Sequence, residues 1–90
     1  MSRLISVITT TYNAENTVED TILSVLNQKG VELEYVIVDD GSTDKTLDVM
    51  KRYSDPRIHI FEAGRVGRGN ALNIGIANST GKYIAILDAD

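Results

Sequence analysis

The chain has 90 residues, of which 42% are hydrophobic and 24% charged, and its formal net charge is −4. These values are typical of one small globular domain, and the acidic balance argues against a nucleic-acid-binding surface, which is normally basic. The absence of cysteine excludes disulfides and thiolate metal sites. No apolar run approaches the ~20 residues that span a bilayer, and no signal peptide opens the chain, so we expect a soluble cytoplasmic domain without a transmembrane segment.

Strand-like apolar runs alternate along the chain with segments of helical periodicity. The expected strands are Leu4–Thr9, Glu34–Val38, Ile58–Phe61 and Tyr83–Leu87. Three of them are almost continuous in Val, Ile and Leu, which predicts strands that are buried on both faces of a parallel sheet. The third run alternates between apolar and polar residues, which predicts an edge strand with His59 on its more polar face.

Helices are expected between these strands, over residues 16–30, 42–56 and 67–81. Asn16 and Glu19 form a capping-box pattern at the start of the first helix. Ser42 or Thr43 is the expected cap of the second helix, and Asp44 is expected in its first turn, where a carboxylate favours the helix dipole. The predicted order is therefore β-α-β-α-β-α-β.

This order predicts an α/β fold with a parallel sheet and right-handed crossovers. All strands of such a sheet end at the same edge, so the segments that follow them lie together. The polar residues of the chain gather in these segments, which read "TTYN", "DDGS", "EAGRVGRG" and "DAD". The coincidence predicts a binding site at the carboxyl edge of the sheet.

Most of these segments have a binding interpretation and a structural alternative. Tyr12 offers a ring on which a base can stack, or it belongs to a Thr/Asn-rich turn that bonds its own backbone. Of Asp39 and Asp40, one can orient the turn while the other accepts from an imide or a ribose hydroxyl; alternatively, both belong to the turn. Arg65 and Arg68 are either a clamp for phosphate oxygens or two solvated side chains.

Asp88 and Asp90 stand two residues apart after the last strand. Carboxylates at this spacing can reach one hard cation, and Mg²⁺ or Mn²⁺ takes its remaining ligands from water and substrate phosphates. The pair therefore suggests a metal that is completed by a nucleoside diphosphate. A partial dinucleotide fingerprint, "GRGNAL", has Leu72 in place of its third glycine or alanine, so a nicotinamide-dependent oxidoreductase is a weaker alternative.

With "ISVITTTYNAENTVEDTILSVLNQ", "YVIVDDGSTDKT" and "ALNIGIANSTGKYIAILDAD" in this order, the chain resembles the N-terminal half of a family 2 glycosyltransferase of the GT-A fold. The resemblance spans essentially all 90 residues. It implies a Rossmann-like parallel sheet of four strands in the order 3-2-1-4. It also implies that residues 1–90 form a nucleotide-diphospho-sugar-binding half-domain, with the acceptor half and the catalytic base beyond Asp90.

The resemblance implies a nucleotide site that draws on all four segments: Thr10, Thr11, Tyr12, Asp39, Asp40, Arg68 and Asp88. In it, Tyr12 packs on the base, Asp40 binds the base and Arg68 lies near the base or the diphosphate. The Asp-x-Asp motif would hold Mn²⁺ or Mg²⁺, with Asp90 as the better ligand and Asp88 closer to the ribose.

The intact enzyme is then expected to transfer a sugar, with inversion, from a nucleoside diphosphate to an acceptor hydroxyl. The resemblance favours UDP as the carrier over GDP or dTDP, and it implies a glycan or lipid-linked acceptor, polysaccharide biosynthesis and a possible membrane association of the full-length protein. The 90-residue chain alone is expected to bind nucleotide at most. A non-catalytic nucleotide-binding or structural α/β module is the alternative, and a homodimer through an exposed last strand is a further expectation.

Overall fold

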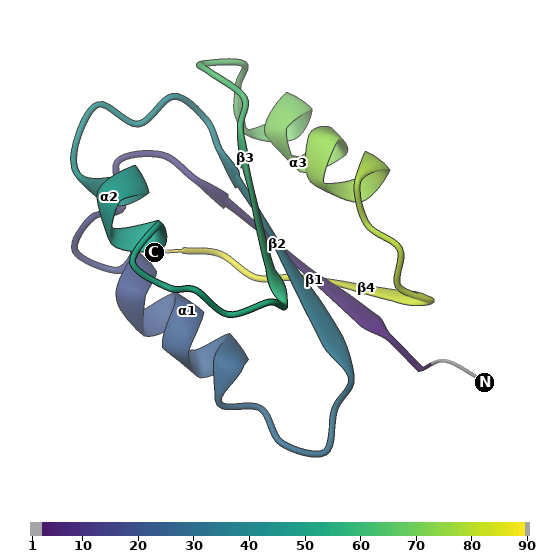
Figure 1. The fold of residues 1–90 in the computed structure, drawn as a ribbon. Helices are drawn as coiled ribbons and strands as arrows, with labels where there is room; N and C mark the ends of the chain where they lie inside the picture. The colour runs from purple at the N-terminus through teal and green to yellow at the C-terminus, as the bar shows by residue number, and fades with distance from the viewer. Residues whose placement is uncertain (1–2, 90) are drawn as a thin grey trace.

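The computed structural model describes residues 3–89. Along them run β1 (Ile5–Thr11), α1 (Val18–Leu26), β2 (Leu33–Asp39), α2 (Thr46–Met50), β3 (Ile58–Glu62), α3 (Arg68–Ala77) and β4 (Tyr83–Ile86). The strands form one parallel sheet in the order β3-β2-β1-β4, which confirms the predicted topology (Figure 1). In the register of this sheet, Ile8 of β1 lies between Val36 of β2 and Ile86 of β4.

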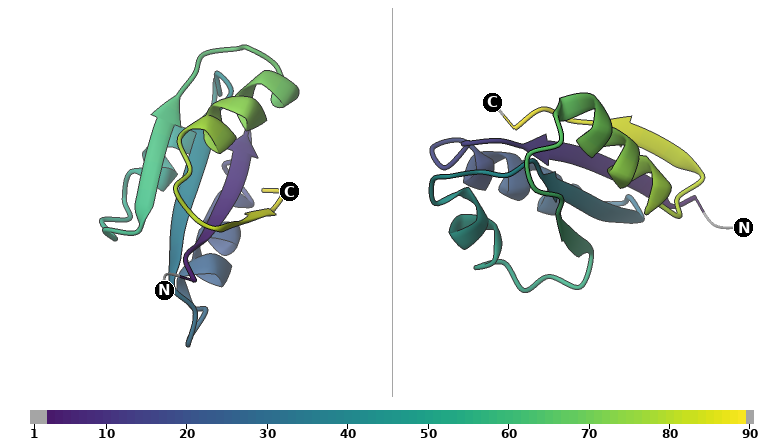
Figure 2. Two further views of the ribbon diagram at one scale, coloured as in Figure 1. Left: turned by 90° about the vertical axis from the view of Figure 1, so that its right-hand side faces the viewer. Right: turned by 90° about the horizontal axis from the view of Figure 1, so that it is seen from above.

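The sheet separates two hydrophobic clusters, because successive side chains of a strand point to opposite faces. Tyr35 and Ile37 of β2 pack against α1 and α2 on one face, whereas Ile8 and Val36 pack against α3 on the other (Figure 2). Helix α3 lies close to β1 because it carries glycine at the contact: a Cβ added at Gly75 would lie 2.6 Å from Cγ2 of Ile8.

The predicted capping box of α1 is wrong. The helix begins at Val18, after Thr17, and has no side-chain cap. The carbonyl oxygen of Ala14 accepts the N–H groups of Thr17 and Val18 at 3.0 and 2.8 Å, so the backbone does what the cap was expected to do. The carboxylate of Glu19 instead accepts a hydrogen bond from the hydroxyl of Tyr53 at 2.5 Å, which joins α1 to the segment that follows α2.

The predicted start of α2 is also wrong, because the helix begins at Thr46 rather than after Ser42 or Thr43. Asp44 lies before the helix instead of in its first turn, and its carboxylate accepts the N–H of Thr46 at 2.9 Å as well as the hydroxyl of that residue. The hydroxyls of Ser42 and Thr43 are used in the loop after β2, which forms part of the site described below.

The two edges of the sheet differ in burial. Strand β3 is an edge strand with His59 exposed, as predicted. The prediction that the last strand is buried on both faces is wrong for the described residues, since Tyr83, Ile84 and Ile86 are 55%, 46% and 52% exposed. The expectation that the last strand is an exposed edge of the sheet is confirmed, and β4 pairs there with β1. Within residues 3–89 no helix combines the length and the apolar character needed to cross a bilayer.

Candidate functional site

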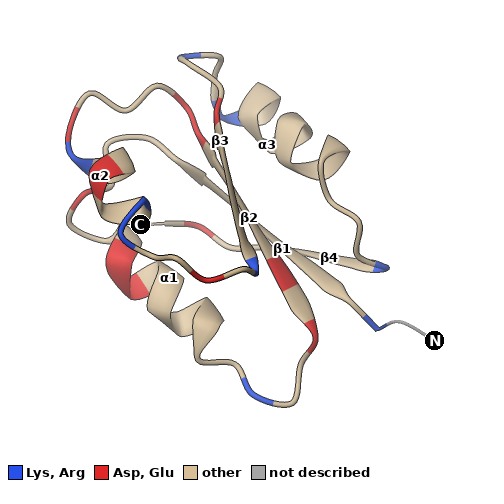
Figure 3. Cartoon of the chain, in the orientation of Figure 1, with Lys and Arg blue, Asp and Glu red and all other residues tan. Residues whose placement is uncertain are grey.

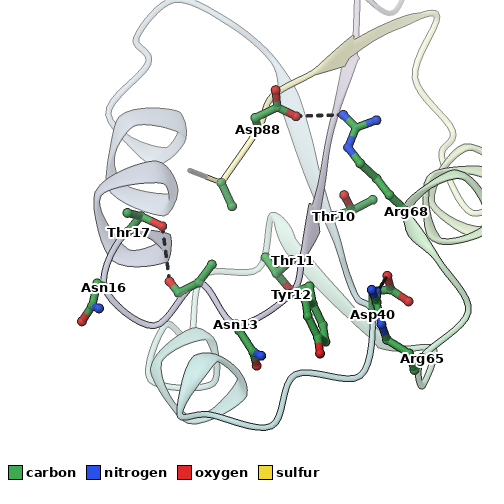
Figure 4. Close-up of a pocket in the computed structure, with 12 residues that line it drawn as sticks. Thr10, Thr11, Tyr12, Asn13, Asn16, Thr17, Asp40, Arg65, Arg68 and Asp88 are labelled. Carbon is green, nitrogen blue, oxygen red and sulfur yellow. Dashed lines mark hydrogen bonds and ion pairs between the residues drawn. The ribbon is translucent and has the colours of Figure 1, made fainter.

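A cavity of about 460 Å³ lies at the carboxyl edge of the sheet (Figure 4). Four segments that are far apart in the sequence line it: Thr10, Thr11, Tyr12, Asn13, Ala14, Asn16, Thr17, Asp40, Arg65, Arg68, Asp88 and Ala89. The predicted meeting of the four post-strand segments at one edge is therefore confirmed. Of the residues predicted to bind nucleotide, only Asp39 does not line the cavity, and the predicted metal ligand Asp90 lies outside the described residues.

The loop after β1 is fastened to the loop after β2. Asn13 has a φ of 50°, a left-handed conformation that asparagine tolerates better than most residues. Its side-chain oxygen accepts the N–H of Thr43 at 2.8 Å, and its own N–H donates to the hydroxyl of Ser42 at 3.0 Å. These bonds hold the backbone after Tyr12, and the N–H of Asp40, which donates to the carbonyl of Thr11 at 2.8 Å, holds it before Tyr12. The half-exposed ring of Tyr12 therefore has a fixed backbone at the cavity.

Glycine in "DDGS" allows the loop after β3 to approach the loop after β2. Gly41 has a φ of 75°, and a Cβ at this position would lie 2.6 Å from the backbone nitrogen of Arg65. Any larger residue would therefore push away the segment that carries Arg65. The close approach brings two post-strand loops into direct backbone contact beside the cavity.

Asp39 is buried and belongs to the turn. Its carboxylate accepts the hydroxyl of Thr11 at 2.8 Å, the hydroxyl of Ser42 at 2.6 Å and the N–H of Ser42 at 2.9 Å. Of the two roles that the sequence leaves open for the acid pair, Asp39 has the one that orients the turn. Its predicted contact with a nucleotide stays a prediction, and the structure places its carboxylate behind the wall of the cavity.

Asp40 is also buried, but its side chain reaches the cavity. One carboxylate oxygen accepts the N–H groups of Val66 and Gly67 at 2.7 and 2.9 Å, and the other forms an ion pair with the guanidinium of Arg65. This guanidinium lies 3.8 Å from the centre of the Tyr12 ring, a cation–π contact. A flat ring, a buried carboxylate and a cation are thus in contact at one end of the cavity.

A second ion pair lies across the cavity. The guanidinium of Arg68, at the first position of α3, is 2.8 Å from the carboxylate of Asp88, and both side chains are largely exposed. The sequence pairs Arg65 with Arg68 as one phosphate clamp, whereas the structure gives each arginine a carboxylate of its own. Both cations nevertheless line the same cavity, where they can reach an anionic ligand.

Few metal-ligating side chains come together among the described residues. Within residues 3–89 no group of three or more potential His, Cys, Asp or Glu ligands comes together. Asp88 supplies one hard oxygen donor at the rim of the cavity. That donor fits Mg²⁺ or Mn²⁺, which keep several waters and bind through few protein carboxylates, and it does not build a closed cage for a structural metal.

Several polar residues that line the cavity were not predicted as site residues, namely Asn13, Asn16 and Thr17. They follow β1 within a few positions, so the rule that brings post-strand segments together covers them too. Residue type alone gave no sign of them, since Asn and Thr are ordinary in turns.

The pattern of the family Glycosyl transferase family 2 matches residues 6–90 of this chain. The chain is 43% identical over 90 residues to TuaG of Bacillus subtilis (strain 168), a protein named for teichuronic acid biosynthesis. That match covers 97% of this chain and 36% of TuaG, so the chain spans about a third of the length of this relative.

Two solved structures share the fold. TarS 1–349 of S. aureus has a TM-score of 0.86 at 31% identity, covering 96% of this chain and 27% of the TarS chain. The mannosyltransferase PcManGT from Pyrobaculum calidifontis, in complex with GDP-Man and Mn²⁺, has a TM-score of 0.86 at 32% identity, with 96% of this chain and 27% of its own covered. These likenesses confirm the predicted arrangement, which is that of the GT-A enzymes.

Proposed function

This chain belongs to glycosyl transferase family 2, and we propose that it forms the nucleotide-sugar-binding part of an enzyme. That enzyme transfers a sugar from a nucleoside diphosphate to an acceptor hydroxyl, with inversion at the anomeric carbon. The observation that carries the proposal is the meeting of Tyr12, Asp40, Arg68 and Asp88, from four separate post-strand segments, around one cavity.

In the proposed complex the base stacks on the ring of Tyr12 and donates its imide N–H to Asp40. Arg65 already contacts both residues, so its guanidinium must rotate toward solvent or onto a carbonyl oxygen of the base when a base binds. A ring N–H next to a carbonyl is found in uracil and thymine, where it belongs to an imide, and in guanine, where it belongs to a lactam. Cytosine and adenine offer a lone pair at that position, which a carboxylate repels.

The diphosphate then lies toward Arg68 and Asp88, on the other side of the cavity. Arg68 exchanges its carboxylate partner for a phosphate oxygen and neutralises charge that develops on the leaving diphosphate. Asp88 and Asp90 are the proposed holders of a divalent cation, and such a cation, when bound, acts as a Lewis acid toward the diphosphate. The acceptor site and its general base are assigned to the part of the relatives that this chain does not cover.

UDP is the proposed carrier, with GDP as the competitor. TarS 1–349 has been solved with UDP-GlcNAc, at 30% identity to this chain, and PcManGT with GDP-Man and Mn²⁺. The proposed contact with Asp40 recognises a ring N–H next to a carbonyl, which uracil and guanine share, so it does not distinguish UDP from GDP. A polysaccharide or a lipid-linked glycan is the proposed acceptor.

Titration of the ¹⁵N-labelled chain with UDP, GDP and CDP, with and without Mg²⁺, tests the proposal. We expect UDP or GDP to shift the amide signals of residues 10–13, 39–41, 65–69 and 88–89, while CDP binds at least about tenfold more weakly because one buried hydrogen bond becomes a repulsion. Asp40→Asn should abolish this preference, whereas Asp48→Asn, an exposed acid on α2, should keep it. Equal binding of all three nucleotides, or shifts away from these residues, would overturn the proposal.

A further inference from the structure

The residues that follow β4 leave the sheet but stay hydrogen-bonded to β1. The pairing of β4 with β1 ends at Ile86 and Ile8, and the N–H of Leu87 donates a last bond to the carbonyl of Ile8 at 2.9 Å. From there the chain runs toward α1 and α2 (Figure 1), and Ala89 packs in the cluster that contains residues of α1. Asp88, which lines the cavity, is carried by this short segment.

A side chain of β1 binds residues 87–89 at the point where the backbone hydrogen bonds between β1 and β4 end. The hydroxyl of Thr9 donates to the carbonyl oxygen of Leu87 at 2.8 Å. The hydroxyl of Tyr35 is also 2.8 Å from the Thr9 oxygen. Since a threonine hydroxyl has one proton and Leu87 receives it, the proton between Thr9 and Tyr35 must come from the tyrosine. The direction of the relay is therefore Tyr35 to Thr9 to Leu87.

Both hydroxyls lie deep in the protein. Thr9 and Tyr35 are fully buried on the face of the sheet that α1 and α2 cover. Burial raises the pKa of Tyr35, although the hydrogen bond with Thr9 works in the other direction, so the phenol stays protonated and remains a donor. A buried relay of this kind is rigid, because each hydroxyl would lose its partner if it rotated away.

The residue on the other side of Asp88 is anchored as well. Ala89 is buried in the cluster formed with α1. Its carbonyl lies 3.4 Å from the hydroxyl of Thr21, which shares its one proton with the nearer carbonyl of Thr17 at 3.2 Å, so burial is the main anchor. Asp88 thus lies between Leu87, whose side chain is exposed but whose backbone N–H and carbonyl are bonded to β1, and Ala89, which is buried. With the backbone held on both sides, the exposed carboxylate of Asp88 faces the cavity and Arg68.

We propose that Thr9 and Tyr35 are positioning residues for Asp88: their hydroxyl relay fixes the backbone of residues 87–89 and thereby the place of the carboxylate at the cavity. The inference rests on the proposed nucleotide site for its functional consequence. Its structural half, the fixing of residues 87–89, is independent of any ligand.

The test compares Thr9→Val, which keeps the shape of the side chain and removes its hydroxyl, with Thr9→Ser, which restores a hydroxyl. Tyr35→Phe removes the first donor of the relay. Ser6→Ala is the matched control, because Ser6 is an equally buried hydroxyl near the other end of β1 and bonds to Glu34 instead of to the segment. Each variant is measured in two ways: ¹⁵N relaxation of residues 87–89 without ligand, and the affinity for UDP with and without Mn²⁺.

For Thr9→Val we expect increased motion of residues 87–89 and a loss of about fivefold to tenfold in UDP affinity with Mn²⁺, the effect of one buried hydrogen bond. Without Mn²⁺ the loss should be less than about twofold, because the base contacts at Tyr12 and Asp40 remain. Tyr35→Phe should lie in between, and Thr9→Ser should regain the wild-type values. Ser6→Ala should change neither readout of the segment, even though it lowers the stability of the chain.

Two outcomes would overturn the inference: unchanged motion of residues 87–89 in Thr9→Val, or a Ser6→Ala variant that loses the Mn²⁺-linked affinity equally. The second result would mean that stability alone is responsible. If the wild-type chain binds no UDP, the proposed function fails, whereas the relaxation data still decide whether Thr9 and Tyr35 fix the segment.

Discussion

Glu34, near the amino end of the sheet, satisfies its carboxylate in a different way from Asp40 and Asp88 at the carboxyl end. Near the amino end, Glu34 accepts the hydroxyl of Ser6 at 2.5 Å, the N–H of Thr80 at 2.6 Å and the hydroxyl of Thr80 at 3.1 Å. At the carboxyl end, two ion pairs join Arg65 to Asp40 and Arg68 to Asp88. Charged residues thus occur at both ends of β2 (Figure 3), but their partners differ in kind.

The hydrogen-bond donors of Glu34 and of the two paired aspartates differ in whether they can move away from the carboxylate. A backbone N–H or a buried hydroxyl is fixed by the fold, so Glu34 is held permanently. The side chains of Arg65 and Arg68 are 58% and 62% exposed, and an exposed guanidinium can rotate from a carboxylate to a ligand at little cost. Asp40 combines both kinds of partner, because one of its oxygens keeps the backbone N–H groups of Val66 and Gly67 while the other has the exchangeable Arg65. The acids with an exchangeable arginine, Asp40 and Asp88, are the ones that line the cavity.

Asp39 tests this comparison, because it lies at the carboxyl end of the sheet but, like Glu34, accepts hydrogen bonds from uncharged hydroxyl and backbone N–H groups. Asp39→Ala should lower the free energy of unfolding by about 3–5 kcal/mol, since it leaves the buried Thr11 hydroxyl and the N–H of Ser42 without their acceptor. This is the largest effect we predict, and urea unfolding followed by circular dichroism measures it.

The control for Asp39→Ala is Asp48→Ala, the removal of an exposed carboxylate on α2, which should cost less than about 0.5 kcal/mol. If Asp39→Ala unfolds at the same urea concentration as the control, the comparison between fixed and exchangeable donors is wrong. Asp39 would then be available for the ligand contact that the family resemblance implies.

Glu34 gives the next largest effect, and it depends on pH. Burial alone would raise the pKa of Glu34, but the hydrogen bonds from Ser6 and Thr80 outweigh it and hold the pKa below its usual value. The folded pKa therefore lies below the unfolded pKa of about 4.3. The stability that Glu34 contributes is complete above the unfolded pKa and is lost as the pH falls through the folded pKa.

Glu34→Gln should therefore be less stable than the wild type by about 1 kcal/mol at neutral pH. The gap should close as the pH falls below the folded pKa of Glu34, where the wild-type carboxylate is protonated as well. Glu32→Gln, two residues earlier and exposed, removes the same charge without these donors and should leave the acid limb of the stability curve unchanged. A gap that stays constant from neutral to acid pH would show that the charge of Glu34 does not matter.

The fold could be predicted because its signals are periodic and local. Runs of Val and Ile, helical spacing between them and the alternation of the two fix a parallel sheet, and the family resemblance supplies its strand order. The caps failed because they depend on which neighbour is nearer: Ala14 offers a carbonyl to the start of α1, and Tyr53 takes the carboxylate of Glu19. Such competition between local and distant partners is invisible in a single sequence.

The site was predictable to the level of segments and less so to the level of side chains. The topology places the four post-strand segments at one edge whatever their residues. Distinguishing Asp39 from Asp40 requires knowing that one carboxylate points toward Ser42 and the other toward Arg65. Neighbouring positions at the end of a strand point to opposite sides, but the sequence does not say which side holds the cavity.

The smallest effect on stability is expected at the exchangeable end. Arg68→Gln breaks an ion pair between two largely exposed side chains, so it should change the free energy of unfolding by less than about 0.5 kcal/mol. The same change should weaken UDP binding several-fold and leave uridine binding unchanged, because only the diphosphate needs the cation. Arg52→Gln, an exposed arginine next to α2, is the matched control and should alter neither. If Arg68→Gln lowers the free energy of unfolding by more than it lowers the free energy of UDP binding, Arg68 is a fixed structural donor like those of Glu34. The exchange of partners proposed for the carboxyl end would then be wrong.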